Sequence, residues 1–251
     1  MAKIVLNDRT FDIDLAAFDK DGTLIDFYHL WGRKARHCVE TLVKRVQGKE
    51  DLRRALYASL GYNPETERTA GDGPLATATM GNIYTIAAAV LYQHGASWDE
   101  AEKCVQESFA AGMGELPTAD LVRPVGDVAA LFRQLTQAGV HIALVTTDDR
   151  AATKATLPLL DIEEHVSLLI CGDDQTPAKP APDAIQQLGV QLGIEPAHTM
   201  VVGDTAADML MATRAGVGCR VGVLSGVGNR TILAAHADVV VDSIDEIRVV
   251  S

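Results

Sequence analysis

The 251-residue sequence predicts an α/β protein with a doubly wound, mostly parallel sheet, interrupted by an inserted segment of helices. Three observations lead to this prediction. Short apolar runs each stop at a polar or acidic residue, helical periodicities separate these runs, and residues 27–118 show helical periodicity without a convincing strand. Apolar runs that do not alternate with polar residues are typical of strands buried on both faces of a parallel sheet.

The apolar runs of the sequence predict one hairpin and six core strands. A small hairpin is expected within residues 3–14, ahead of the sheet itself. Each later apolar run is four or five residues long, which suits a buried strand better than a helix. The six core strands are expected at Leu15–Phe18, His141–Val145, Leu168–Cys171, Thr199–Val202, Cys219–Val223 and Ala237–Val241.

Helices are predicted between these strands from apolar periodicity and from their end residues. Proline suits the first turn of a helix and glycine suits the position just after the last turn. The core helices are expected from Val128 to Leu135 with an end at Gly139, over Ala184–Leu192 behind Pro182, and over Asp204–Ala215 before Gly216.

The inserted segment reads as a succession of amphipathic helices. Ser97 and Glu100 have the spacing of a capping box and predict the start of the last one. Pro117 and the glycine-rich stretch Ala70–Gly81 are expected to be boundaries or loops. We therefore predict an α/β core formed by residues 1–26 and 119–251, and a helical domain formed by residues 27–118. Its earlier helices are expected over Leu30–Val46, Lys49–Leu60 and Leu75–Gln93.

Composition excludes several classes of protein. The sequence holds 22 basic and 34 acidic residues, a net charge of −12, which argues against nucleic-acid binding through phosphate neutralisation. The apolar stretch Ile86–Tyr92 is too short to cross a membrane, and no secretory signal is visible at the start. The cysteines are expected to be reduced, the protein cytoplasmic, and its assembly either a monomer or a homodimer. They are scattered without a close pair, at Cys38, Cys104, Cys171 and Cys219.

Polar side chains collect where the predicted strands end. The carboxyl ends of parallel strands meet at one edge of an open α/β sheet, where ligands bind. Acids that converge there repel one another unless a cation lies between them, and Mg²⁺ prefers oxygen ligands of this kind. The side chains expected at this edge are those of Asp19, Asp21, Thr146, Thr147, Lys179, Asp204 and Asp208.

The same set of side chains predicts phosphoryl transfer. A metal ion and Lys179 can neutralise phosphate oxygens, Thr146 can donate a hydrogen bond, and a carboxylate can attack phosphorus in line. Gly22 allows the backbone of the first loop to approach a ligand closely. Carboxylate nucleophiles that form aspartyl-phosphates are an established chemical route.

Four motifs in this order resemble those of the haloacid dehalogenase-like (HAD) superfamily, in particular its phosphoglycolate phosphatase-like branch. The resemblance covers essentially the whole core, and the insert lies where that branch carries its helical cap. It implies a Rossmann-like core and a Mg²⁺-dependent phosphatase that acts on a small phosphorylated metabolite, with phosphoglycolate as the default. The motifs are Asp19-Lys-Asp-Gly-Thr23, Thr146 after its strand, Lys179-Pro-Ala-Pro182 and Gly203-Asp-Thr-Ala-Ala-Asp208.

The resemblance also implies a role for each matched residue. Asp19 would be the nucleophile, and Asp21 the general acid for the leaving group and then the base for water. Gly22, Thr146, Thr147 and Lys179 would bind the phosphoryl group. The metal ligands would be Asp19, the backbone carbonyl of Asp21, and Asp204, with Asp208 supporting or completing the metal site.

Some features depart from the pattern or leave alternatives open. Lys20 occupies a position that is usually apolar in the resembled family, and Thr147 stands where relatives often have asparagine. A phosphosugar mutase and a pyrophosphatase share the core motifs, and a binding protein without turnover is the non-enzymatic alternative. Within the insert, packing explains a group of polar side chains as well as substrate contact does, namely those of His29, Trp31, Arg33, Thr77, Thr79 and Asn82.

Overall fold

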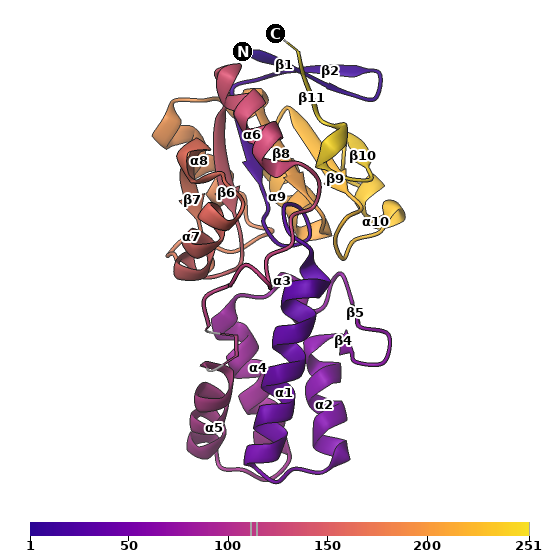
Figure 1. The fold of residues 1–251 in the computed structure, drawn as a ribbon, viewed down its shortest axis with the longest axis vertical. Helices are drawn as coiled ribbons and strands as arrows, with labels where there is room; N and C mark the ends of the chain where they lie inside the picture. The colour runs from indigo at the N-terminus through magenta and orange to yellow at the C-terminus, as the bar shows by residue number, and fades with distance from the viewer. Residues whose placement is uncertain (111, 114, 251) are drawn as a thin grey trace.

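The computed structural model describes residues 1–110, 112, 113 and 115–250. The molecule is elongated, with an α/β part at one end and a bundle of helices at the other (Figure 1). Both chain termini lie at the end of the α/β part that is remote from the helices.

The central sheet has six strands in the order β10-β9-β8-β3-β6-β7, and every neighbouring pair is parallel. All six runs predicted as strands are found in it. The strand β3 lies in the middle, between β6 and β8, so the carboxyl ends of these three strands are adjacent. Their bounds are β3 Leu15–Phe18, β6 His141–Val145, β7 Val166–Ile170, β8 Thr199–Gly203, β9 Cys219–Val223 and β10 Val239–Val241.

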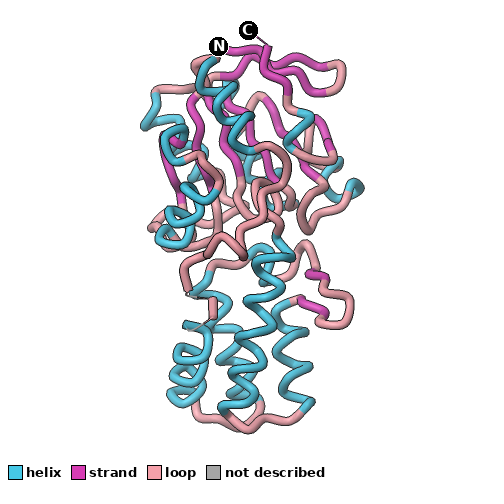
Figure 2. The backbone as a smooth tube through the Cα atoms, viewed as in Figure 1, coloured by secondary structure: helices cyan, strands magenta, loops and turns pink. Residues whose placement is uncertain are grey.

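Helices cover both faces of this sheet (Figure 2). Along β3, Ala16 and Phe18 belong to one apolar cluster, whereas Leu15 and Ala17 belong to another on the opposite face. Side chains of a strand alternate between faces, so an unbroken apolar run is what burial on both faces requires. The core helices are α6 Val128–Gln137, α7 Arg150–Leu159, α8 Asp183–Leu192, α9 Ala206–Ala215 and α10 Arg230–Ala234.

An antiparallel sheet of three strands lies at the far end, where β1 Ala2–Leu6 pairs with both β2 Arg9–Ile13 and β11 Arg248–Val250. The predicted hairpin is therefore present, and a strand from the other end of the sequence completes it. Three short 3₁₀ turns complete the core, at Glu163–His165, Pro196–His198 and Ile244–Glu246.

The described part of the inserted segment consists of helices joined by loops, together with one pair of two-residue strands, β4 Tyr62–Asn63 and β5 Arg68–Thr69. The capping box at Ser97 is present, because Ser97 N donates to Glu100 Oε2 at 3.2 Å and Glu100 N donates to Ser97 Oγ. Among the described residues, no helix is both long and apolar enough to cross a membrane. The helices are a π-helical turn Tyr28–Gly32, α1 Arg33–Arg45, α2 Glu50–Leu60, α3 Pro74–Thr77, α4 Met80–Gln93 and α5 Trp98–Ala110.

One predicted helix of the insert was wrong in its extent. The stretch Leu75–Gln93 is not continuous, because α3 ends at Thr77 and α4 begins at Met80. Ala78 and Thr79 between them have extended backbone, with ψ angles of 153° and 159°. Apolar spacing persists across the break, and so periodicity alone does not reveal it.

Candidate active site

Loops that follow three adjacent strands build the candidate site. Asp19 and Asp21 follow β3, Thr146 follows β6, and Asp204 follows β8. The backbone N–H of Asp19 donates to the carbonyl of Val202 at 2.9 Å, which keeps the first loop beside β8.

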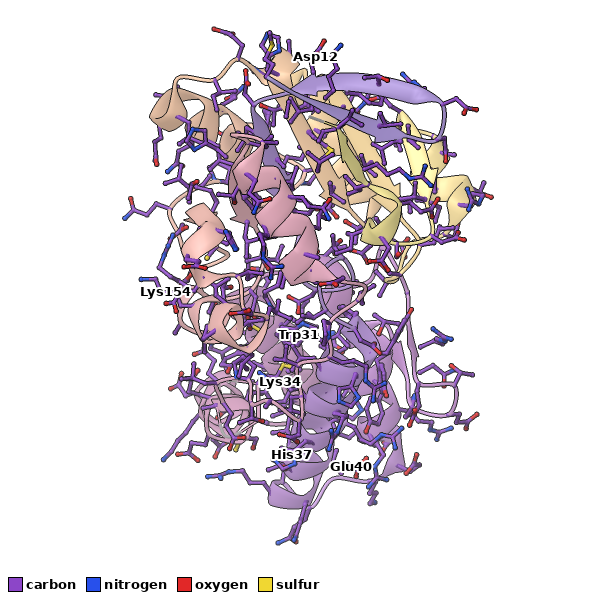
Figure 3. All side chains as sticks on the ribbon, turned by 45° about the horizontal axis from the view of Figure 1, so that its top comes forward. Asp12, Trp31, Lys34, His37, Glu40 and Lys154 are labelled. Carbon is purple, nitrogen blue, oxygen red and sulfur yellow. The ribbon has the colours of Figure 1, made fainter. Side chains whose placement is uncertain are left out.

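A cavity opens at this edge, between the sheet and the helical segment. The sheet part contributes carboxylates, one ammonium and hydroxyls, whereas the helical segment contributes mainly apolar side chains. Trp31, one of these, lies at the end of α1 that faces the sheet (Figure 3). The lining residues are Asp19, Asp21, Phe27, Trp31, Leu75, Ala76, Thr77, Ala78, Met80, Ile83, Thr147, Asp148, Lys179, Asp204, Thr205, Ala207 and Asp208.

Lys179 joins the first and the last of the predicted motifs. Its Nζ donates to Asp19 Oδ1 at 2.5 Å and to Asp208 Oδ1 at 2.6 Å, and its side chain is almost entirely buried. Burial alone would lower the pKa of Lys179, but the two carboxylates outweigh it and raise that pKa. Lys179 is therefore a fixed positive charge beside Asp19.

Burial raises the pKa of Asp19 to about 7, although the ammonium of Lys179 opposes this effect. The pKa of Asp204 is also raised well above its usual value, by burial and then by the charges of Asp19 and Asp208. Carboxylates that repel one another in this way are stabilised by a cation among them.

Asp204 has one oxygen held by the protein and one that is free. Its Oδ2 accepts from the backbone N–H of Val227 at 2.8 Å, whereas Oδ1 is buried without a hydrogen-bond partner among the described residues. Gly22 and Gly226 pack directly against this carboxylate, and a Cβ on Gly22 would lie 2.5 Å from Asp204 Oδ2. Gly22 also has a φ of +92°, which disfavours any other residue.

The arrangement fits a hard divalent cation. Oxygen atoms of Asp19, Asp204 and Asp208 lie within 4.8 Å of one another, and the free Asp204 oxygen supplies an unused ligand. A buried acceptor that makes no hydrogen bond is otherwise costly. Oxygen donors are the ligands that Mg²⁺ takes in proteins.

Asp208 is largely engaged by protein groups. It is the third residue of α9, where its Oδ2 accepts from the backbone N–H of Thr205 at 3.1 Å and from Thr205 Oγ1 at 2.5 Å. Its Oδ1 accepts from Lys179. Asp208 is thus both the capping-box residue of α9 and the support of Lys179.

Lys20, the unusual residue of the first motif, is fully buried. Its Nζ lies 2.8 Å from Asp21 Oδ1 and 3.0 Å from Asp148 Oδ2. Burial raises the pKa of Asp21, and the charge of Lys20 opposes that rise. Sequence reasoning noted Lys20 as a departure but missed Asp148, whose only signal was its place three residues after a predicted strand.

The two threonines after β6 lie in different surroundings. Thr147 lines the cavity, whereas Thr146 is buried behind it and lines a neighbouring hollow together with Lys179. Thr146 Oγ1 accepts from the backbone N–H of Asp148 at 3.1 Å.

Of the six side chains of the insert that the sequence singled out, Trp31 and Thr77 line the cavity. His29 Nε2 lies 2.7 Å from the carbonyl of Asp120, and Arg33 lines a separate hollow on the helical segment. Thr79 and Asn82 are not among the described residues that line the cavity. Trp31 and Thr77 therefore contact the cavity, whereas Arg33 and Asn82 are exposed.

The family described as haloacid dehalogenase-like hydrolase matches residues 13–216. This match includes all four motifs and most of the sequence, and so the chain belongs to the haloacid dehalogenase-like hydrolases. The family membership predicted from the motifs is confirmed.

Individual relatives include phosphatases. The chain is 27% identical over 234 residues to validoxylamine A 7'-phosphate phosphatase of Streptomyces hygroscopicus subsp. limoneus, a match that covers 93% of this chain and 95% of the relative. It is 30% identical over 129 residues to a phosphoglycolate phosphatase of Neisseria meningitidis, which covers 50% of this chain and 54% of that protein.

The fold has close counterparts among solved structures. A predicted phosphoglycolate phosphatase from Haemophilus somnus 129PT superposes with a TM-score of 0.69 at 19% identity. The superposition covers 92% of this chain and 95% of that one, so the likeness extends over the helical segment as well as the sheet.

Proposed function

We propose that this protein is a Mg²⁺-dependent phosphatase that hydrolyses a small phosphate monoester through an aspartyl-phosphate. The observation that carries the proposal is that Asp19 accepts from Lys179 at 2.5 Å and lies close to Asp204, whose Oδ1 has no hydrogen-bond partner among the described residues, in the lining of one cavity. A nucleophile, a cation for phosphate oxygens and a ligand for a metal then lie at one point.

In the proposed reaction an oxygen of Asp19 attacks phosphorus, and the bond from phosphorus to the ester oxygen breaks. Asp21 gives its proton to the departing alkoxide. A water molecule then attacks the phosphorus of the aspartyl-phosphate, Asp21 takes a proton from that water, and inorganic phosphate leaves with Asp19 restored.

Lys179 holds negative oxygens of the phosphoryl group in this scheme. In the proposal Thr147, which lines the cavity, donates a hydrogen bond to the phosphoryl group. Thr146 Oγ1 accepts from the N–H of Asp148, which leaves its own O–H available as a second donor. Gly22 leaves room for Asp204; its own N–H donates to the carbonyl of Ile25 and its carbonyl accepts from Ser225 Oγ, so its part in the scheme is to shape the first loop.

Asp19, the carbonyl of Asp21 and Asp204 are the proposed metal ligands, and Asp208 supports them through Lys179. When bound, Mg²⁺ supplies positive charge that offsets the negative charge of the phosphoryl oxygens. The unpartnered oxygen of Asp204 and the raised pKa values of Asp19 and Asp204 support this assignment.

We propose that residues 27–118 act as a cap over the core formed by residues 1–26 and 119–251. The helical segment provides the apolar wall of the cavity, and its closure excludes bulk water while the aspartyl-phosphate forms.

The same wall favours an organic group without charge. Among the described residues that line the cavity, none from the helical segment is a lysine, an arginine or a histidine. Phosphoglycolate, the ester in the name of the Neisseria relative, carries a carboxylate besides its phosphate. That carboxylate would meet only Lys179, which already contacts two acids. We therefore propose a neutral monoester as substrate, with phosphoglycolate as the alternative.

The test is hydrolysis of p-nitrophenyl phosphate, ethyl phosphate and phosphoglycolate with Mg²⁺ and with EDTA. We expect phosphate release that requires Mg²⁺, and a higher kcat/KM for ethyl phosphate than for phosphoglycolate. The reverse preference would refute the neutral substrate. Absence of release at every Mg²⁺ concentration would refute the phosphatase.

A mutase is distinguished in the same assay series. A phosphosugar mutase returns the phosphoryl group to its substrate, and so it would convert glucose 1-phosphate to an isomer without free phosphate. A pyrophosphatase would release phosphate from inorganic pyrophosphate faster than from any monoester. We expect neither result.

A further inference from the structure

Lys20 has a place that the proposed reaction does not explain. It stands in the sequence between two acids of the site, yet its side chain has no exposed surface and is absent from the cavity lining. The hydrogen bonds to Asp19 and Asp208 come from Lys179. Lys20 is therefore not placed to bind the phosphoryl group.

The contacts of Lys20 connect two loops of the site. Its Nζ donates to Asp21 at 2.8 Å on the loop after β3, and it lies 3.0 Å from Asp148 on the loop after β6. Asp148 is fixed in turn, because its Oδ1 accepts from the backbone N–H of Asp149 at 2.8 Å. Its own N–H donates to Thr146 Oγ1.

This arrangement restricts Asp21. Both Asp21 oxygens lie 2.8 Å from Lys20 Nζ, and Asp21 lines the cavity whereas Lys20 does not, so the ammonium holds a carboxyl group that reaches the cavity. Burial of a lysine is costly unless it is paired with good geometry, and so a fully buried ammonium between two acids has little freedom to move. A group that transfers a proton must lie within hydrogen-bond reach of the reacting oxygen.

We infer that Lys20 and Asp148 form a positioning pair that holds the Asp21 carboxyl group against the leaving-group oxygen of the substrate. The inference rests on the proposed phosphatase function, in which Asp21 transfers the proton. Lys20 does not line the cavity and acts on the substrate through Asp21; Asp148 lines the cavity, and in this inference it acts through Lys20.

A positioning role predicts an effect that depends on the leaving group. An alkoxide needs a proton as the ester bond breaks, whereas p-nitrophenolate leaves without one. General acid catalysis contributes on the order of a hundredfold to ten-thousandfold, and misplacement of the acid forfeits part of that factor. The value of kcat/KM reports the steps up to formation of the aspartyl-phosphate and is the quantity to compare.

The experiment compares Lys20→Met with the wild type, using ethyl phosphate and p-nitrophenyl phosphate at saturating Mg²⁺. Methionine has about the length of lysine without its charge. We expect kcat/KM for ethyl phosphate to fall at least about tenfold, and kcat/KM for p-nitrophenyl phosphate to stay within about threefold of the wild type.

Two further variants separate positioning from folding. Lys20→Met alone leaves Asp148 buried without its partner, so the double variant Lys20→Met/Asp148→Asn removes one charge of each sign and keeps the wild-type net charge. Its thermal unfolding should lie near that of the wild type, with the same selective loss on ethyl phosphate. Lys154→Met, on the exposed side of α7, should leave both substrates unchanged (Figure 3).

Equal losses on both esters in the double variant, or no loss on either, would overturn the positioning pair. If the wild type releases no phosphate from either ester, the proposed function itself fails, which is a different result from a variant that loses no selectivity.

Discussion

Replacement of Asp19 by asparagine should abolish turnover and at the same time stabilise the metal-free fold. Asparagine has nearly the shape of aspartate, but it cannot attack phosphorus as a carboxylate does. We expect kcat to fall by at least about a thousandfold. A variant that retained more than about a tenth of wild-type activity would refute Asp19 as the nucleophile, because an enzyme that depends on one nucleophile loses most of its activity without it.

The stability gain follows from the raised pKa of Asp19. Its pKa rises from 3.8 to about 7 on folding, so between these two values the folded state binds a proton that the unfolded state has released. Stability therefore falls as pH rises through this window, and at pH 8 the full cost is present. Three pKa units correspond to about 4 kcal/mol. Lys179 loses one of its two carboxylate partners in the variant, and so we expect a net gain of about 1–3 kcal/mol.

The assay is urea unfolding of both proteins in EDTA at pH 5 and pH 8. The variant should be more stable at pH 8, and its advantage should shrink at pH 5, where wild-type Asp19 is protonated in the folded state. Excess Mg²⁺ should also reduce the advantage, because the wild type has the better metal site and gains more from binding. A variant that is less stable at pH 8, or an advantage independent of pH, would refute this account of the acid cluster.

Two other substitutions test the support of the site. Gly22→Ala should lower the free energy of unfolding by about 1–3 kcal/mol and weaken Mg²⁺ binding, because the new Cβ would press on Asp204 and the φ of Gly22 is positive. The control Gly81→Ala, in α4 with open space around it, should be neutral or stabilising in the same urea titrations. Asp208→Ala should lower both the unfolding temperature and kcat, because it removes the capping box of α9 and an ion pair of the site. The control Glu100→Ala removes the capping box of α5 and should lower the unfolding temperature slightly, with kcat unchanged. Equal effects on kcat from these two cap variants would contradict the role given to Asp208.

Much of the core could be predicted because its signals are local. Four-residue and five-residue apolar runs have few alternatives to buried strands, and β3 shows why, since its successive side chains enter opposite apolar clusters. The acids Asp19 and Asp204 end two of these strands, and parallel strands bring their carboxyl ends together whatever the details of packing.

The break between α3 and α4 lies within the stretch Ala70–Gly81 that was predicted as a boundary or loop, but the helix predicted over Leu75–Gln93 crosses it. Ala78 and Thr79 carry no proline or glycine to end a helix, and the apolar spacing continues on both sides. Ala78, in this extended stretch, lies in the wall of the cavity. Local propensity is a weak guide where tertiary contacts compete with it.

The sequence by itself determined the six strands of the central sheet, three of the core helices, the motif acids at the strand ends and the family to which the chain belongs, because each depends on residues close together along the chain. Only the tertiary structure decided that Lys20 meets Asp148 and that Lys179 joins Asp19 to Asp208. These partners are separated by 29 to 160 positions along the chain. Their meeting depends on how the loops fold over the sheet edge, and the burial that follows fixes the charges of the site.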